Sequence, residues 1–294
     1  MRGPALAALI CAACNATLGG NPAVSDAPGD DDAVIEPDGP GPDAPLGAFG
    51  APQKVGIAGT GAREDDGSLS NSGLEMVFAR VNPTDNQKDL FYASRLDLLS
   101  EFGAAVKLPF SADNSSEETP RFSDDDLTLF FAKTNGANLQ DVFRVTRPTA
   151  GAPTFGSPSL VDGVNSAAVD KWFMPCTGNR YLMILGADIA EGVLGGGPPT
   201  VVAELSTARS ETGPFVTTDC LTTYFASNRP DGVTNRIYTS SRAAIGAPWS
   251  TPTVVTDFAL LGGAQQDPFM SKDQRTFMLV SDITGTTDVY ISTR

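Results

Sequence analysis

Residues 225–242, FASNRPDGVTNRIYTSSR, form the stretch from which the fold can be worked out. It reads as a strand ending near Asn228, a tight turn over Pro230, Asp231 and Gly232, and a second strand, RIYTSSR. Proline fixes φ for a turn, and Asp-Gly tolerates the positive φ that a tight hairpin needs. The stretch therefore predicts a β-hairpin.

The same hairpin recurs along the chain. Each copy pairs an apolar strand with a polar turn and a second strand that ends in a small residue, Ser or Thr, and Arg. The other copies are VFARVNPTDNQKDLFYASR ending at Arg95, FFAKTNGANLQDVFRVTR ending at Arg147 and LVSDITGTTDVYISTR ending at Arg294. A repeated unit determines the architecture, so it is interpreted before any single motif.

Each unit also has a strand before the hairpin and one after it. The segments SLSNSGLEMVFA, RFSDDDLTLFFA, FVTTDCLTTYFA and FMSKDQRTFMLV each contain a strand, a turn centred on Ser/Thr-x-Asp/Ser, and an alternating strand. An outer strand with a shared aromatic and valine spacing is predicted at residues 48–55, 101–108, 154–161 and 248–255. Each unit is therefore expected to have four strands.

The apolar residues that close the second strand give the count of units. They are Phe78, Phe131, Phe225 and Leu279. They recur at intervals of about 40–55 residues if two repeat periods separate Phe131 from Phe225. One further unit is therefore needed between these two residues.

A degenerate third unit fills this gap. It consists of residues 172–185 followed by 199–209, with Ile184 in the Phe position and GVLGGGPP in its hairpin loop. It shows no clear outer strand. We count five units, four of them clear.

This repeat predicts an all-β chain folded as a β-propeller of five four-stranded blades. The 30 glycines and 22 prolines suit many short strands joined by turns. A single blade cannot bury both of its faces, so blades stack around an axis and the ring must close. No outer strand follows the third strand of the last unit, so we expect residues 48–55 to pair with the last blade and close the ring.

Three regions are expected along the chain. Residues 1–14 read as a signal peptide, because one positive charge precedes a short apolar run. Cys14 follows Cys11-Ala12-Ala13, which resembles a bacterial lipobox and implies that Cys14 carries a lipid. A plain cleaved signal or a misassigned start codon are the alternatives.

The second and third regions are a tether and the propeller. Residues 15–47 are rich in Asp, Pro, Gly and Ala and cannot bury enough apolar surface to offset their ordering entropy. We expect them to form a flexible acidic tether to the propeller at residues 48–294.

Charge and composition narrow the classes of function. The net charge of −15 repels nucleic-acid phosphates and anionic membranes, which argues against a nucleic-acid partner. The chain has no histidine, which excludes Ser-His-Asp and Cys-His catalysis and any His-ligated zinc or haem. Carboxylate chemistry remains the main enzymatic route, and no cofactor is predicted.

These motifs resemble the TolB-type, WD40-like propeller repeat of bacterial envelope proteins. The resemblance covers roughly residues 48–294 and implies an envelope protein whose propeller serves as a docking surface. The matching residues are Asp267-Pro268 with Ser271-Lys272-Asp273, Thr119-Pro120 with Ser123-Asp124-Asp125, the turn at 227–232, and Asp288-Val289-Tyr290.

Acidic residues lead into the inner strands of the predicted blades. In a symmetric ring they should converge near one mouth of the central channel. There they would hold a cation through oxygen ligands or meet a basic partner, although solvated rim charges are the simpler interpretation and no metal is predicted. These candidate binding residues are Glu64, Asp65, Asp66, Glu117, Glu118, Asp170, Glu211 and Asp267.

Charged residues also flank the third strands. They would form a binding ring, or they would pair with each other or with turn carbonyls inside each blade. Because they recur as the fold recurs, we favour the structural interpretation. The pairs are Asp89 with Arg95, Asp141 with Arg147, Asp288 with Arg294 and, as a variant, Arg236 with Arg242.

Catalysis is the alternative to binding. Some five-bladed propellers are glycosidases that place an acid and a base in the channel. Here the acids occupy equivalent positions of the repeat, as expected of a scaffold, and only Asp170 and Asp188 in the divergent third unit break the pattern. We therefore predict no catalytic residue.

Cys176 and Cys220 lie in turns of adjacent units, about one blade apart. In an oxidising compartment they are candidates for a disulfide. Their positions in the repeat differ by two, and a disulfide needs Cα atoms within about 7 Å, so the pairing stays open.

The predicted protein is an exported, monomeric, non-catalytic lipoprotein of the cell envelope, anchored in the outer membrane through its lipid alone. Its propeller would bind an envelope protein or a cell-wall or surface polymer. The rivals are a glycosidase-like carbohydrate-active enzyme and a purely structural surface lipoprotein.

Overall fold

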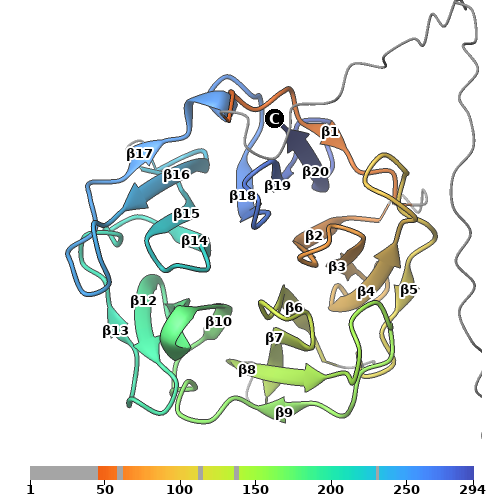
Figure 1. Ribbon diagram of the computed structural model, residues 1–294, viewed down its shortest axis with the longest axis horizontal. Coiled ribbons are helices and arrows are strands. Elements are labelled where there is room, and N and C mark those ends of the chain that lie inside the picture. The colour runs from red at the N-terminus through yellow and green to blue at the C-terminus, as the bar shows by residue number, and fades with distance from the viewer. Residues whose placement is uncertain (1–45, 58–61, 112–114, 136–138, 230–231) are drawn as a thin grey trace, which may run out of the picture. The chain divides into compact units, whose positions relative to one another are not determined.

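The computed structural model describes residues 46–57, 62–111, 115–135, 139–229 and 232–294. In these residues the strands form five four-stranded antiparallel sheets, arranged as blades around a ring (Figure 1). This confirms the predicted all-β propeller. No helix in the described ranges is long and apolar enough to cross a membrane. The predicted signal, Cys14 and most of the predicted tether lie outside the described residues.

Each blade runs from an inner strand beside the channel to a two-residue outer strand. The inner strands are β2 (Glu64–Leu69), β6 (Glu117–Phe122), β10 (Asp170–Cys176), β14 (Glu211–Val216) and β18 (Gln265–Met270). The second strands are β3 (Glu75–Val81), β7 (Thr128–Asn135), β11 (Arg180–Leu185), β15 (Thr222–Ser227) and β19 (Thr276–Ser281). The third strands are β4 (Lys88–Ser94), β8 (Leu139–Thr146), β12 (Asp188–Val193), β16 (Arg236–Ser241) and β20 (Asp288–Thr293). The outer strands are β5 (Val106–Lys107), β9 (Ser159–Leu160), β13 (Thr200–Val201), β17 (Thr253–Val254) and β1 (Gln53–Lys54).

The ring closes as predicted, through β1. This strand pairs antiparallel with β20, with Gln53 opposite Ile291 and Lys54 opposite Tyr290. Blade five therefore consists of β18, β19 and β20 from one end of the sequence and β1 from the other (Figure 1). Only Gln53–Lys54 of the predicted strand at 48–55 is regular strand.

A repeated ion pair shows that β1 is equivalent to the other outer strands. Lys54 lies 2.7 Å from the carboxylate of Asp288 on the third strand of blade five. Lys107 on β5 lies 2.9 Å from Asp89 on the third strand of blade one. The same residue types meet at the same place in both blades.

The prediction for blade three was partly wrong. Its third strand is β12 rather than residues 199–209, and that range instead contains an outer strand, β13. Leu185 pairs with Asp188, so the turn contains only two residues. Gly186 has a φ of 68°, which such a tight hairpin requires. Sequence comparison with the longer turns of the other units missed this short one.

The register of blade three also moves the Phe position by one residue. Ile184 pairs with Lys171 on the inner strand, as Ala79 pairs with Asp65 in blade one. The counterpart of the Phe position is therefore Met183.

The arginine that ends each clear unit is structural, as favoured from the sequence. Its Nε donates to a carbonyl in the turn between the first two strands, at 2.7–2.8 Å. Its guanidinium lies over the aromatic residue of the outer segment. The sets of arginine, carbonyl and aromatic residue are Arg95 with Gly73 and Phe102, Arg147 with Asp126 and Phe155, Arg242 with Cys220 and Trp249, and Arg294 with Gln274 and Phe49.

Two of these arginines also clamp neighbouring blades together. Arg147 binds both carboxylate oxygens of Glu75 in blade one, at 2.6 and 2.8 Å. Arg242 binds both oxygens of Glu191 in blade three, at 2.8 and 3.0 Å. Planar two-point pairs of this kind fix orientation as well as distance, so they set the angle between blades.

Candidate functional site

Each inner strand contains a β-bulge halfway along its length. The register with the second strand shifts there in all five blades. One residue at each shift has a positive φ, between 48° and 58°, and only one of the five is glycine, which adopts such a φ without strain. The five residues are Asp66, Thr119, Trp172, Gly213 and Asp267.

Prolines mark the same bulges in three blades. Pro120, Pro214 and Pro268 directly follow the residue with positive φ. Proline has no backbone N–H, so it fits a place where a ladder hydrogen bond is interrupted. The local sequence thus helps to place the bulge.

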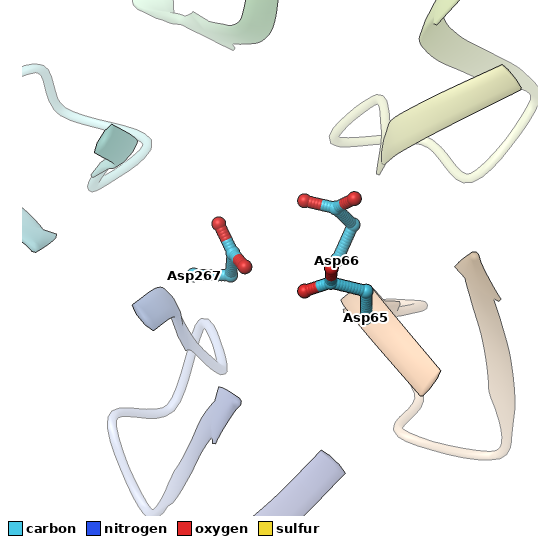
Figure 2. A group of neighbouring side chains, drawn as sticks. All are labelled: Asp65, Asp66 and Asp267. Atoms are coloured by element: carbon cyan, nitrogen blue, oxygen red, sulfur yellow. The ribbon is translucent and has the colours of Figure 1, made fainter. Parts of the chain in front are cut away.

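Charged and polar side chains from four blades meet around these bulges, and we call them the channel cluster. Figure 2 shows Asp65 and Asp66 on β2 and Asp267 on the adjacent inner strand β18, with carboxylate oxygens within 4.8 Å of one another. The full cluster is Asp65, Asp66, Lys88, Glu118, Arg121, Lys171, Trp172 and Asp267.

Blade four contributes no side chain to the channel cluster. Instead, its backbone at Gly213 lies close to Asp267 of blade five. A Cβ on Gly213 would lie 2.7 Å from Oδ1 and 2.9 Å from Cα of Asp267. Glycine is therefore required at this bulge because Asp267 of blade five packs against it. Opposite it, Trp172 Nε1 donates to Asp267 Oδ1 at 2.9 Å, so blades three and five are joined across the ring.

Lys88 holds the acids of the cluster together. Its Nζ lies 2.8 Å from Asp66, 3.1 Å from Asp65 and 2.7 Å from Glu118. This ammonium group supplies the positive charge that a metal ion would bring to the same carboxylates. The residues present therefore do not favour a divalent cation at Asp65, Asp66 and Asp267.

Arg121 is the second cation of the cluster and is completely buried. Its Nη1 donates to the carbonyls of Gly67 at 2.9 Å and Pro120 at 2.8 Å, whereas its Nε and Nη2 have no hydrogen-bond partner. Burial lowers the pKa of Arg121, and the nearby carboxyls of Asp267 and Asp66 oppose this shift. The guanidinium therefore contributes mainly its positive charge, which interacts with the carboxyls of Asp267 and Asp66.

The carboxyls of the cluster are not alike. Burial raises the pKa of Asp267 well above its usual range, and the neighbouring charge of Asp66 adds to this shift. Burial also raises the pKa of Asp66, although Lys88 opposes it. Burial alone would raise the pKa of Glu118, but Lys88, Lys171 and Gln140 together outweigh it and the pKa is lowered. The pKa values of Asp267 and Glu118 are thus shifted in opposite directions within one cluster.

The eight acids predicted from the sequence are all buried, and they fall into two sets. Asp65, Asp66, Glu118 and Asp267 belong to the channel cluster. The other four begin their inner strands and are bound within their own blades: Glu64 by Arg80, Glu117 by Lys133 and Ser111, Asp170 by Ser166, and Glu211 by Arg229 and Thr207.

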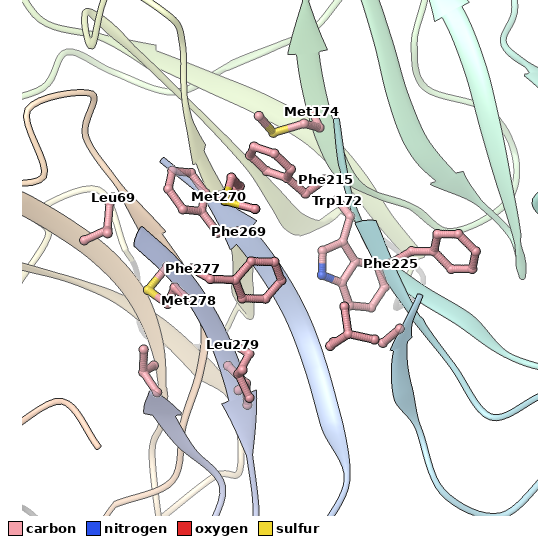
Figure 3. Close-up of a cluster of buried hydrophobic side chains, with 14 of the residues drawn as sticks. Leu69, Trp172, Met174, Phe215, Phe225, Phe269, Met270, Phe277, Met278 and Leu279 are labelled. Atoms are coloured by element: carbon pink, nitrogen blue, oxygen red, sulfur yellow. The ribbon is translucent and has the colours of Figure 1, made fainter. Parts of the chain in front are cut away.

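A cavity of about 270 Å³ opens where the inner strands end, and we call it the cup. Its floor consists of apolar side chains from all five blades, several of which are seen in Figure 3. No residue of the channel cluster lines it. The floor residues are Leu69, Phe122, Met174, Pro175, Phe215, Phe269 and Met270.

The rim of the cup is formed by the turns between first and second strands. In four blades the first residue of the Ser/Thr-x-Asp/Ser turn accepts the backbone N–H five residues later, and the third accepts the N–H two residues beyond itself. The predicted turn is therefore present in these blades. The second residue takes no part in these bonds and is free to vary: it is Asn71, Asp124, Thr218 or Lys272.

These four residues, which we call the rim residues, meet around Asp124. Lys272 Nζ lies 3.0 and 3.1 Å from the two carboxylate oxygens of Asp124. Thr218 Oγ1 donates to Asp124 Oδ1 at 3.3 Å, and the side-chain amide of Asn71 donates to the Asp124 carbonyl. Sequence reasoning missed these residues. The signal was present, because they vary inside a turn that otherwise repeats.

A disulfide ties blade three to the rim turn of blade four. Cys176 and Cys220 are bonded, with Cα atoms 5.5 Å apart. The backbone N–H of Thr177 donates to the Thr218 carbonyl at 2.8 Å. The short 3-10 helix Thr177–Asn179 of blade three is thereby fixed to the turn of blade four.

A second cavity, of about 720 Å³, lies between blades three and four. Its lining includes Glu191, Arg242 and Trp249, together with Gly196 and Gly197. The first three form the same clamp between blades that Glu75, Arg147 and Phe155 form between blades one and two. We therefore regard this cavity as a gap left by the scaffold.

Comparison with known proteins supports the fold. No protein-family model matches the sequence, and no curated protein matches it at a significant level. The structure of putative TolB from Agrobacterium tumefaciens is similar, with a TM-score of 0.51, 15% identity, and coverage of 76% of this chain and 72% of that one.

Glycosidase structures are similar as well. An α-L-arabinofuranosidase from Podospora anserina in complex with cellotriose has a TM-score of 0.56 and 11% identity, over 83% of this chain and 95% of that one. The catalytic domain of a GH62 α-L-arabinofuranosidase from Coprinopsis cinerea has a TM-score of 0.54 and 12% identity, over 84% and 96%. At these identities the likeness shows the β-propeller fold alone.

Proposed function

We propose that the protein is a non-catalytic scaffold of the cell envelope whose propeller docks a partner protein at the cup. The observation that supports this best is the contrast along the inner strands. The carboxyls of the channel cluster are sealed, with Asp66 0% and Asp267 1% exposed. The cup beyond them is open, is formed by all five blades, and has a rim of residues that the fold leaves free to vary.

A glycosidase is the second candidate, because the cluster contains a pair of carboxyls. Glycosidases use two carboxyls that reach the sugar from opposite sides, and a raised pKa such as that of Asp267 suits a general acid. Burial of Asp66 and Asp267 argues against this function, because a sugar must contact both groups. Lys88 and Arg121 also give these acids structural partners.

The size of the cup favours a protein as the partner. Pockets for small ligands usually measure about 300–1,000 Å³, whereas the cup measures about 270 Å³. It would take one or two inserted side chains more readily than an oligosaccharide. A cell-wall or surface polymer is therefore an outcome of the test below rather than our choice.

We place the protein in the envelope as a lipoprotein, with Cys14 lipidated and residues 15–47 as the tether. The signal-like residues 1–14 support export. The disulfide between Cys176 and Cys220 supports an oxidising compartment. Labelled palmitate should enter the wild-type chain made in a bacterial host but not Cys14→Ala. An unlabelled wild-type chain would refute the anchor.

Docking at the cup can be tested by capture from an envelope extract with the full chain. Thr218→Trp should block the cup, because Thr218 is an exposed rim residue. Thr251→Trp is the matched control, since Thr251 is exposed and does not line the cup. We expect the wild type and Thr251→Trp to capture the same proteins, and Thr218→Trp to lose them.

Three results would contradict the proposal. Equal capture by all three chains would place the binding surface elsewhere. Hydrolysis of an aryl α-L-arabinofuranoside that Asp267→Asn abolishes would favour the enzyme. Capture of peptidoglycan or surface polysaccharide in place of protein would change the partner class.

A further inference from the structure

We propose that the cup recognises a lysine or arginine side chain of the partner protein, and that Lys272 takes this cation's place when the partner is absent. The proposal rests on the proposed function, since it specifies the chemistry of the docked partner. It assigns Asp124 as the anchor for the incoming cation and Lys272 as a tethered competitor.

The charge of the cup favours a cation. Its lining includes the acids Asp124, Asp126 and Asp219 but only one base, Lys272. The chain as a whole carries a net charge of −15. An acidic concave surface on an acidic protein attracts cations and repels anions.

Asp124 is the acid that can change partners. Asp126 is 7% exposed, and both its carboxylate oxygens accept the backbone N–H of Asn71. Asp219 accepts hydrogen bonds from Thr217 and from the backbone of Leu221 inside its turn. The carboxylate of Asp124 contributes nothing comparable to its own turn and extends toward blades four and five.

The present partner of Asp124 is weakly held. The side chains of Asp124 and Lys272 are each 55% exposed. Ion pairs this exposed contribute little to stability, because water and salt screen them and the long side chain loses entropy. An incoming cation can therefore displace Lys272 at small cost.

The floor of the cup gives an incoming side chain an advantage over Lys272. Phe122, Phe215 and Phe269 lie below the rim. Aromatic faces attract cations, and the methylene stem of lysine or arginine packs on apolar surface. A partner that fills the cup from above would combine both contacts with the ion pair to Asp124.

The test uses a phage-displayed library of random heptapeptides, selected on the full chain. We expect selected peptides to be enriched in Lys or Arg and to lose binding to Thr218→Trp. Asp124→Asn should weaken them about tenfold or more, since a charge-assisted hydrogen bond is lost. Lys272→Met should strengthen them about two- to fivefold, since an exposed competitor is removed.

The charge-matched control is Asp162→Asn. Asp162 is an exposed acid that does not line the cup, so its loss should leave the affinity unchanged. Salt should weaken binding to the wild type more than binding to Asp124→Asn, because only the wild type makes the ion pair.

The outcomes separate this inference from the proposed function. One outcome would overturn the inference and leave docking at the cup intact. In it, the selected peptides fail to bind Thr218→Trp, but they are not enriched in Lys or Arg and they bind Asp124→Asn as tightly as the wild type. Peptides that bind Thr218→Trp as well as the wild type would overturn both. Weaker binding to Lys272→Met would also contradict the role of Lys272 as a competitor.

Discussion

The inner strands of the propeller have two halves that differ in character. Up to and at the bulge they carry buried acids, whose charge is compensated by Lys88 from a third strand and by Arg121 just past the bulge of blade two. Beyond the bulge their apolar side chains form the floor of the open cup. The halves differ because the bulge changes the direction of the strand in every blade. Charge in the channel thus serves the scaffold, while the accessible surface lies at its mouth.

The largest effect is expected at the centre of the channel cluster. Arg121→Met would remove a completely buried cation and leave Asp66 and Asp267 without its compensating charge. The free energy of unfolding should fall by about 3–5 kcal/mol, as when one partner of a buried pair is removed. Urea denaturation of both chains measures this, and a change within 1 kcal/mol would contradict a structural role for the cluster.

The repeat explains why most of the fold can be predicted from the sequence. Turns such as Ser123-Asp124-Asp125 and strand-ending residues such as Arg147 recur, so each copy supports the interpretation of the others. Blade three departs from the repeat, and there the prediction misplaced a strand. Its Gly186-Ala187 turn is too short to resemble the others, and a single glycine carries its geometry.

A smaller effect is expected where the rim is covalently tied. Replacing both Cys176 and Cys220 with Ser removes a crosslink between residues 44 apart, which should cost about 2–4 kcal/mol. It should also loosen the contact of Thr177 with Thr218 at the cup. Dithiothreitol should lower the melting temperature of the wild type and leave the double variant unchanged. No response in the wild type would contradict a stabilising disulfide.

Because of Asp267, one part of the free energy of unfolding should decrease as pH rises. Its pKa is raised in the folded chain, mainly by burial, so folding favours its protonated form. The contribution is present at low pH and is lost as pH rises through the folded pKa. Asp267→Asn, which stays neutral, should lose this part of the decline between acidic and neutral pH.

Comparing the two chains isolates Asp267 from the opposite trend of Glu118. The lowered pKa of Glu118 contributes stability that is lost as pH falls. Melting temperatures of the wild type and Asp267→Asn across the same pH range give the difference. A difference that does not change with pH would show that Asp267 titrates as it does in the unfolded chain.

The candidate site was harder to predict than the fold. Sequence position placed Glu64 and Asp66 in one acidic set, but the bulge sends Asp66 to the cluster while Glu64 binds Arg80 within its blade. That separation depends on backbone direction, which the residue types do not encode by themselves. The rim residues, by contrast, are recognisable once the hydrogen bonds of the turn are known. The side chains of Asp124 and Lys272 take no part in those hydrogen bonds.

The most direct test of the division between the two halves is the affinity of the captured partner for two variants. Thr218→Trp alters the cup and Asp267→Asn alters the channel cluster, and each can be titrated against the same partner by calorimetry. We predict that Thr218→Trp loses binding by at least about tenfold, a cost of about 1.4 kcal/mol, while Asp267→Asn binds as the wild type does. Loss of binding in Asp267→Asn with full binding in Thr218→Trp would place the function in the channel and contradict this account.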